Sequence, residues 1–198
     1  YFVAINPFDD EPGLFENKLF NRLPILTFIK IFKKVFENDE IKKICQNGKY
    51  DIAVLRSIGI GVKNFYFDTM LASYVLDADQ KHGMDDLAEK YLNYSPIPIS
   101  SLIGEKKDPK KIFEVEASIL SNYAAEDADI TYKLYERLDK ELKKAGIEKV
   151  AYEIEFPLVP VLQEMENEGI KIDIPALNAF SKDLQILLDN YTSEIYKT

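Results

Sequence analysis

The feature that most constrains the fold is residues 121–131, where a helical apolar repeat meets a phenol and a carboxylate. Apolar side chains recur at helical spacing from Ile130 to Leu138, which predicts an amphipathic α-helix. Tyr123 and Asp127 are four residues apart and therefore share one face of this helix. Burial of an ionised carboxylate is costly unless a metal ion or a partner group compensates it. The pair indicates a functional site, and the alternative is a surface helix with solvated acidic residues.

Short strand-like runs and helical patterns alternate along the rest of the chain. The strand-like runs are residues 1–5, 41–44 and 65–67. Apolar residues at helical spacing predict helices at residues 24–36, 49–57, 70–76, 84–91, 112–145, 154–168 and 175–198. This alternation predicts an α/β fold.

Composition limits the classes of protein to consider. The 198 residues carry a net charge of −9, which argues against a broad basic surface that grips nucleic acid. A site that holds phosphate through divalent ions needs carboxylates, so an acidic chain remains compatible with nucleic acid. The single cysteine, Cys45, excludes an internal disulfide and a thiolate zinc cluster. No apolar run has the length of a membrane span, and we expect a cytoplasmic protein.

Four segments together resemble the bacterial family A DNA polymerases. Residues 45–51 (CQNGKYD) are similar to the second motif of their 3′–5′ exonuclease domain. Residues 67–92 (from FDTMLASY to HGMDDLAEKYL) resemble the segment that follows it. Residues 123–129 (YAAEDAD) are similar to the third motif, in the form with Tyr four residues before Asp. Residues 155–173 resemble the junction at which the polymerase domain begins.

The resemblance implies a ribonuclease H-like mixed sheet flanked by helices, with a C-terminal helical extension. This family's exonuclease domain binds two divalent ions, Mg²⁺ or Mn²⁺, through four carboxylates. By motif, Asp51 and Asp127 would be two of these catalytic, metal-binding carboxylates, and Tyr123 would orient the attacking water. Such ions prefer oxygen ligands and activate water for phosphodiester hydrolysis. A phenol with a pKa near 10, roughly, is a poor base, so it would position the water rather than deprotonate it.

The resemblance also implies partners. Gln46 and Asn47 lie where the second motif approaches the single-stranded 3′ end of a DNA primer, and Lys81 is a further candidate for a DNA contact. Asn47 is in addition placed to cap the following helix, and Asp68 is placed to cap the helix predicted at residues 70–76. The remainder of the polymerase would be a partner in cis. We expect a monomer in the bacterial cytoplasm, associated with the nucleoid, and no membrane partner.

One part of the family pattern is not found. The family's first motif is an Asp-x-Glu on the first strand, and it supplies two of the four carboxylates. Residues 9–11 (DDE) match it by letter, but they follow Pro7 in a predicted loop and lie too close to Asp51. We therefore expect an N-terminally incomplete exonuclease domain at residues 1–150 and the start of the polymerase domain at residues 151–198. Metal binding by this chain would be weak or absent, and the chain itself would be nearly or wholly inactive.

Two other functions remain open. The domain could be a non-catalytic spacer that supports the polymerase, although the joint presence of Asp51, Tyr123 and Asp127 argues against a parent that lost its site. It could also be a ribonuclease D-like RNA exonuclease of the same superfamily. The polymerase-like junction at residues 155–173 argues against that assignment.

Overall fold

The computed structural model describes residues 3, 5–6, 23–104, 112 and 114–197. The chain divides into two compact units, Tyr1–Glu164 and Met165–Thr198. The first unit thus extends beyond residue 150, where we placed the start of the polymerase-like part from the sequence. That assignment remains a prediction, since compactness alone does not identify a polymerase domain.

Two short parallel strand pairs lie in the described part of the first unit. Strand β1 (Ile5–Asn6) pairs with β2 (Leu23–Pro24), and β3 (Lys43–Cys45) pairs with β4 (Phe65–Asp68). The register of the second pair aligns Ile44 with Phe67. The α/β class predicted from the sequence is confirmed, although the described part of the chain is mostly helical.

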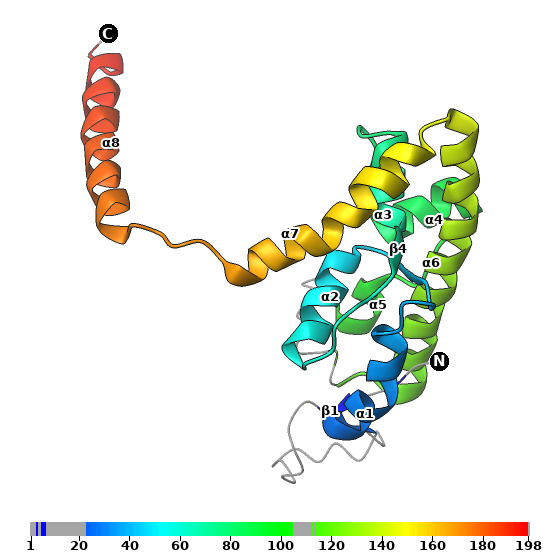
Figure 1. The fold of residues 1–198 in the computed structure, drawn as a ribbon. Helices are drawn as coiled ribbons and strands as arrows, with labels where there is room; N and C mark the ends of the chain where they lie inside the picture. Colours follow the sequence, from blue (N-terminus) through cyan, green and yellow to red (C-terminus); the bar gives the residue numbers. More distant parts are fainter. Residues whose placement is uncertain (1–2, 4, 7–22, 105–111, 113, 198) are drawn as a thin grey trace. The chain divides into compact units, whose positions relative to one another are not determined.

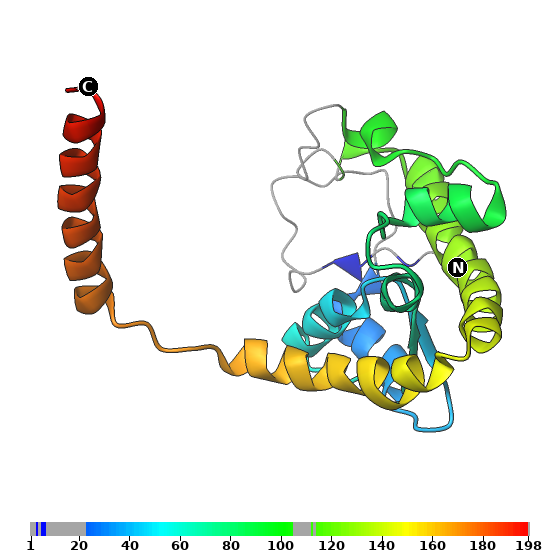
Figure 2. The ribbon, with the colours of Figure 1, turned by 90° about the horizontal axis from the view of Figure 1, so that it is seen from above.

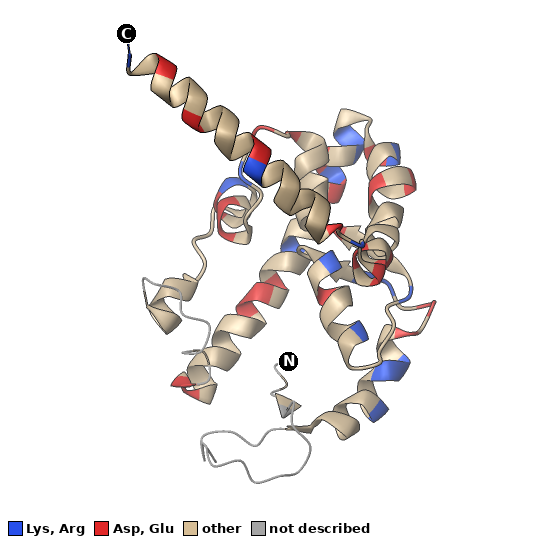
Figure 3. Cartoon of the chain, turned by 90° about the vertical axis from the view of Figure 1, so that its left-hand side faces the viewer, with Lys and Arg blue, Asp and Glu red and all other residues tan. Residues whose placement is uncertain are grey.

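Helices surround these strands in the first unit (Figures 1 and 2). They are α1 (Ile25–Phe36), α2 (Gly48–Ser57), α3 (Thr69–Leu76), α4 (Met84–Leu92), α5 (Ile99–Ile103), α6 (Ala117–Ala145), the π-helix η2 (Val150–Glu155) and the part of α7 (Phe156–Glu168) up to Glu164. Acidic and basic residues are interspersed along their ribbons (Figure 3). None of the helices in the described ranges is long and apolar enough to span a membrane.

The core forms around the C-terminal half of α6. Helices α3 and α4 pack against α6, and burial removes apolar surface from water. The buried cluster consists of Phe67, Ala72, Leu87, Ala88, Ile130, Leu134, Leu138, Leu142, Ala151 and Phe156. Gly146 ends α6 in the left-handed conformation, with φ of 70°, which glycine adopts without strain.

Side chains of β3 and β4 come unusually close to the backbone where β3 enters α2. A Cβ atom added to Gly48 would lie 2.4 Å from Phe65 Cε2 and 2.7 Å from Cys45 Cβ. These distances are shorter than any side chain tolerates, so β3, β4 and the start of α2 meet at a point that only glycine fits.

The second unit consists mainly of α8 (Ile174–Ile195). Asp173 caps this helix, because its side chain accepts a hydrogen bond from the Ala176 amide at 3.0 Å. The apolar side chains of α8 remain exposed, for example Leu184 at 49% and Tyr191 at 61%. Within its own unit the helix therefore has no packing partner for its apolar face.

Candidate active site

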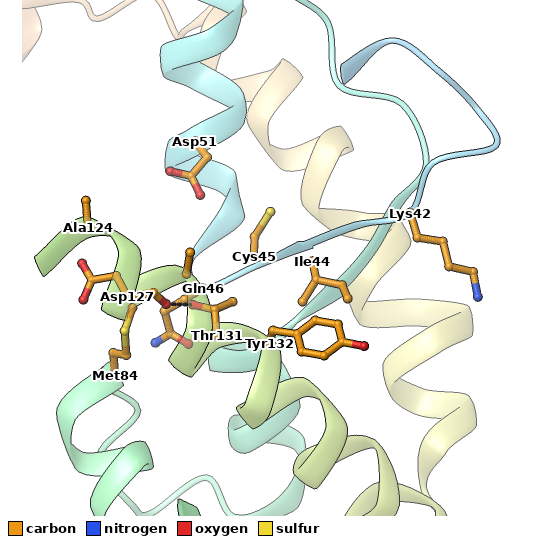
Figure 4. A pocket seen from close by; sticks show the side chains of 11 residues that line it. Lys42, Ile44, Cys45, Gln46, Asp51, Met84, Ala124, Asp127, Thr131 and Tyr132 are labelled. Carbon is orange, nitrogen blue, oxygen red and sulfur yellow. Dashed lines mark hydrogen bonds between the residues drawn. The ribbon is translucent and has the colours of Figure 1, made fainter. Parts of the chain in front are cut away.

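A cavity of about 740 Å³ brings two of the predicted carboxylates together (Figure 4). Asp51 reaches it from the first turn of α2, and Asp127 reaches it from α6. Gln46, from the end of β3, also lines it. Asn47, Lys81 and Tyr123 are not among its lining residues.

The cavity follows one edge of strand β3. Ile44 and Cys45 line it, whereas no residue of β4 does. Within the described residues, β3 has β4 as its neighbour on one side only. The cavity therefore lies along an edge whose backbone hydrogen-bonding groups are available to a further strand.

Asp51 lies in the first turn of a helix, where negative charge is favourable. Solvent still reaches its side chain. Two causes raise the pKa of Asp51 to about 6: desolvation by the surrounding protein atoms, which is the larger, and the negative charge of Asp68. A carboxyl group with such a pKa is readily protonated, and a bound cation would favour its ionised form.

Tyr123 and Asp127 form a coupled pair on α6. Burial, the negative charge of Asp127 and that of Asp85 raise the pKa of Tyr123 to about 12. The phenol therefore stays protonated and acts as a hydrogen-bond donor. Burial and the charges of Glu126 and Asp85 raise the pKa of Asp127, while the hydrogen bond from Tyr123 lowers it.

Gln46 is held at both ends of its amide. Its Nε2 donates to the backbone oxygen of His82 at 3.0 Å, and its Oε1 accepts from the Thr69 hydroxyl. His82 is in turn fixed by a 2.8 Å contact between its Nδ1 and Ser73 Oγ. Because these partners are distant in sequence, no local pattern pointed to this network.

The remaining two predicted DNA contacts lie outside the cavity lining. Asn47 has a left-handed backbone with φ of 61°, and its side chain makes no capping hydrogen bond. The prediction that the Asn47 side chain caps α2 is therefore wrong. Lys81 is 83% exposed and lies 3.6 Å from Asp86 Oδ1, with which it forms an ion pair. Contacts from either residue to DNA remain predictions.

The carboxylates in the cavity are of the type that binds divalent ions, but they are fewer than the four that the family resemblance implies. Carboxylate oxygens are the ligands that Mg²⁺ and Mn²⁺ prefer. Among the described residues, however, no group of three or more acidic, histidine or cysteine side chains is placed to hold one ion. Residues 9–11, the match by letter to the first motif, lie outside the described residues. The described part of the chain thus offers Asp51 and Asp127, half of the four carboxylates expected.

An α/β domain with a carboxylate-lined cavity at a strand edge is consistent with a class of proteins, the nucleases of ribonuclease H-like architecture. The family model described as 3′–5′ exonuclease matches residues 15–143. This chain belongs to the 3′–5′ exonuclease domain family of bacterial DNA polymerase I.

Relatives agree with this assignment, and solved structures share the fold. DNA polymerase I of Rhizobium leguminosarum is 39% identical over 177 residues, which are 89% of this chain and 17% of that protein. The fold is similar to that of the POL domain of Pol1 from M. smegmatis, with a TM-score of 0.61 and 21% identity over 80% of this chain and 24% of that one. A Brucella melitensis NrnC structure with bound Mg²⁺ gives a TM-score of 0.56 and 27% identity over 71% of this chain and 66% of that one.

Proposed function

We propose that this chain supplies half of a divalent-metal-dependent 3′–5′ exonuclease site that removes nucleotides from single-stranded DNA 3′ ends, as in proofreading. The observation that carries the proposal is the cavity along β3, which Asp51 and Asp127 line from two different helices. The chain spans 17% of the length of its Rhizobium relative. Polymerase activity would require the rest of such a protein, acting with this domain in cis in the bacterial cytoplasm.

The chain's own residues have distinct parts in this proposal. Asp51 and Asp127 would hold the ions, which when bound would acidify the attacking water and stabilise the leaving oxygen. Tyr123 is protonated and hydrogen-bonded to Asp127, so its oxygen would accept a hydrogen bond from the water and orient it. Gln46, fixed by His82 and Thr69, would present its remaining amide hydrogen toward the terminal nucleotide.

The other half of the site would come from outside the described residues. The family's first motif lies on a strand, and the open edge of β3 beside the cavity is where an added parallel strand would place two carboxylates near Asp51 and Asp127. Without them, two carboxylates would hold one ion weakly. We therefore expect little or no hydrolysis by this chain alone.

The test is degradation of a 3′ single-stranded DNA oligonucleotide in Mn²⁺ or Mg²⁺. We expect the chain alone to be nearly inactive, and the chain extended upstream to include an Asp-x-Glu strand to be active. Asp127→Ala should abolish that activity, whereas Asp129→Ala, an exposed change on the same helix, should not. Activity of the unextended chain that depends on Asp9 and Glu11 would instead place the first motif at residues 9–11.

Two outcomes would replace the proposal. If the extended chain is inactive on every substrate, the domain is a spacer that supports the polymerase. A matched RNA oligonucleotide addresses the second alternative. Faster degradation of RNA than of DNA would assign the domain to RNA 3′ ends.

A further inference from the structure

We propose that Asp68 is a positioning residue of this site. Its carboxylate links the start of α3 to the segment that carries Gln46 and leads into Asp51. The inference rests on the proposed function, in which Asp51 is a metal ligand. The sequence suggests only that Asp68 caps the helix that follows it. The structure adds a second set of partners on the neighbouring strand.

Asp68 is 1% exposed and accepts hydrogen bonds from four backbone amides. Its Oδ1 accepts from Met70 and Leu71 in the first turn of α3, at 2.9 and 3.2 Å. The same oxygen accepts from Asn47 at 3.2 Å, and Oδ2 accepts from Gly48 at 2.7 Å. One buried carboxylate therefore caps α3 and, across the β3–β4 pair, the start of α2.

Helix α2 needs this external cap. The first amides of a helix have no partner within it, and a preceding Asn normally supplies one through its side chain. Here the Asn47 side chain makes no such bond, and Gly48 has no side chain to offer. Asp68, which lies 20 positions further along the chain than Gly48, supplies this cap instead.

The neighbouring Thr69 extends the same attachment. Its hydroxyl lies 3.2 Å from the backbone oxygen of Cys45 and also contacts the Gln46 amide oxygen. Residues 45–48 are thus held at several points by the junction of β4 and α3. Asp51 follows Gly48 by less than one helical turn, so its direction into the cavity depends on how the helix start is fixed.

Asp68→Ser separates the two roles of this carboxylate. A serine still caps α3, but its side chain is too short to reach Asn47 and Gly48. The measurement is an NMR titration of the full chain with Mn²⁺, followed by paramagnetic broadening of the amides near Asp51. We expect Asp68→Ser to weaken Mn²⁺ binding about 10- to 100-fold, as loss of a group that orients a metal ligand does. Binding equal to that of the unchanged chain would overturn the inference.

Three further variants secure the comparison. Asp173→Ser removes the same type of carboxylate cap at the start of α8 and should leave Mn²⁺ binding unchanged. Asp68→Asn keeps the shape and one acceptor oxygen, so it should bind Mn²⁺ with intermediate affinity, and it serves if the serine variant does not fold. Asp51→Asn removes a proposed metal ligand and therefore gives the paramagnetic broadening expected when the metal site is absent.

Failure of the proposed function gives a different result. In that case neither this chain nor the chain extended upstream would bind Mn²⁺ better than its own Asp51→Asn variant does. Amide hydrogen exchange then tests the positioning role, because Asp68→Ser should speed exchange at Asn47 and Gly48 while Met70 and Leu71 remain protected. If hydrogen exchange became faster by the same factor at all four amides, Asp68 would only stabilise the fold and would not position α2 specifically.

Discussion

The two halves of α6 have different surroundings, although one continuous helix forms both. Ile130, Leu134, Leu138 and Leu142 in its C-terminal half are at most 2% exposed. No described residue of the helix before Ile130 is buried to that degree, and Asp127 faces the cavity. The difference shows how one half anchors the helix while the other presents ionisable groups at a fixed place.

The largest expected effect comes from the anchored half. Leu138→Ala should lower the free energy of unfolding by about 2–5 kcal/mol, because it leaves a cavity in the core. Urea unfolding followed by circular dichroism measures this loss. The matched control is Ile119→Ala in the other half, where the side chain is 50% exposed and the change should stay within about 0.5 kcal/mol. Similar losses from both variants would contradict the division of the helix.

Asp127→Asn should leave stability at pH 7 equal to or higher than that of the unchanged chain. The pKa of Asp127 is raised in the folded state, so ionisation of this group opposes folding as the pH rises through that pKa. The same variant should weaken Mn²⁺ binding at least about tenfold. Thermal unfolding and Mn²⁺ titration measure the two effects, and Asp129→Asn should change neither by much. A strongly destabilised Asp127→Asn would place this residue with the anchoring half.

Asp51→Asn extends the comparison to α2 and gives a pH-dependent signature. The folded-state pKa of about 6 exceeds the ordinary value of 3.8, so the stabilising contribution of the neutral carboxyl is present below pH 4, roughly, and is lost above pH 6, roughly. With allowance for solvent screening, we expect the variant to be more stable than the unchanged chain by about 1 kcal/mol at pH 7.5. The advantage should vanish at pH 3.5, roughly. A difference that does not vary with pH would refute this explanation.

The smallest effect is expected on α8, whose apolar repeat resembles that of the anchored half of α6. Leu184 is 49% exposed, so Leu184→Ala should change the free energy of unfolding of this chain by less than about 0.5 kcal/mol. Urea unfolding again provides the measurement. A loss near that of Leu138→Ala would mean that this face is covered in solution.

Local sequence patterns predicted those structural features that depend on residues close to one another in the sequence. The apolar spacing around Leu134 predicted α6, and the position of Asp68 after a strand predicted a helix cap, which its bonds to Met70 and Leu71 confirm. By contrast, the bonds from Asp68 to Asn47 and Gly48 depend on strand pairing. No local pattern records which strands lie side by side.

The site itself was predictable only in part. The spacing of Tyr123 and Asp127 follows from helix geometry, but Asp51 is far from both in sequence, and only the family resemblance placed it in the same site. The structure brings Asp51, Asp127 and Gln46 to one cavity. It gives Lys81 an acidic neighbour in the first turn of α4, Asp86, which the resemblance did not indicate.

Gly48 has a consequence for how such a domain can change over evolutionary time. Any side chain at this position would collide with Phe65 and Cys45, so a mutation there would damage the fold whether or not the domain cuts DNA. Asp51 is under no such constraint, because its charge opposes folding at neutral pH. Selection for the scaffold alone would therefore retain Gly48 while allowing Asp51 to drift. A descendant with glycine at position 48 and no carboxylate at position 51 would be a domain that kept its architecture after it lost its chemistry.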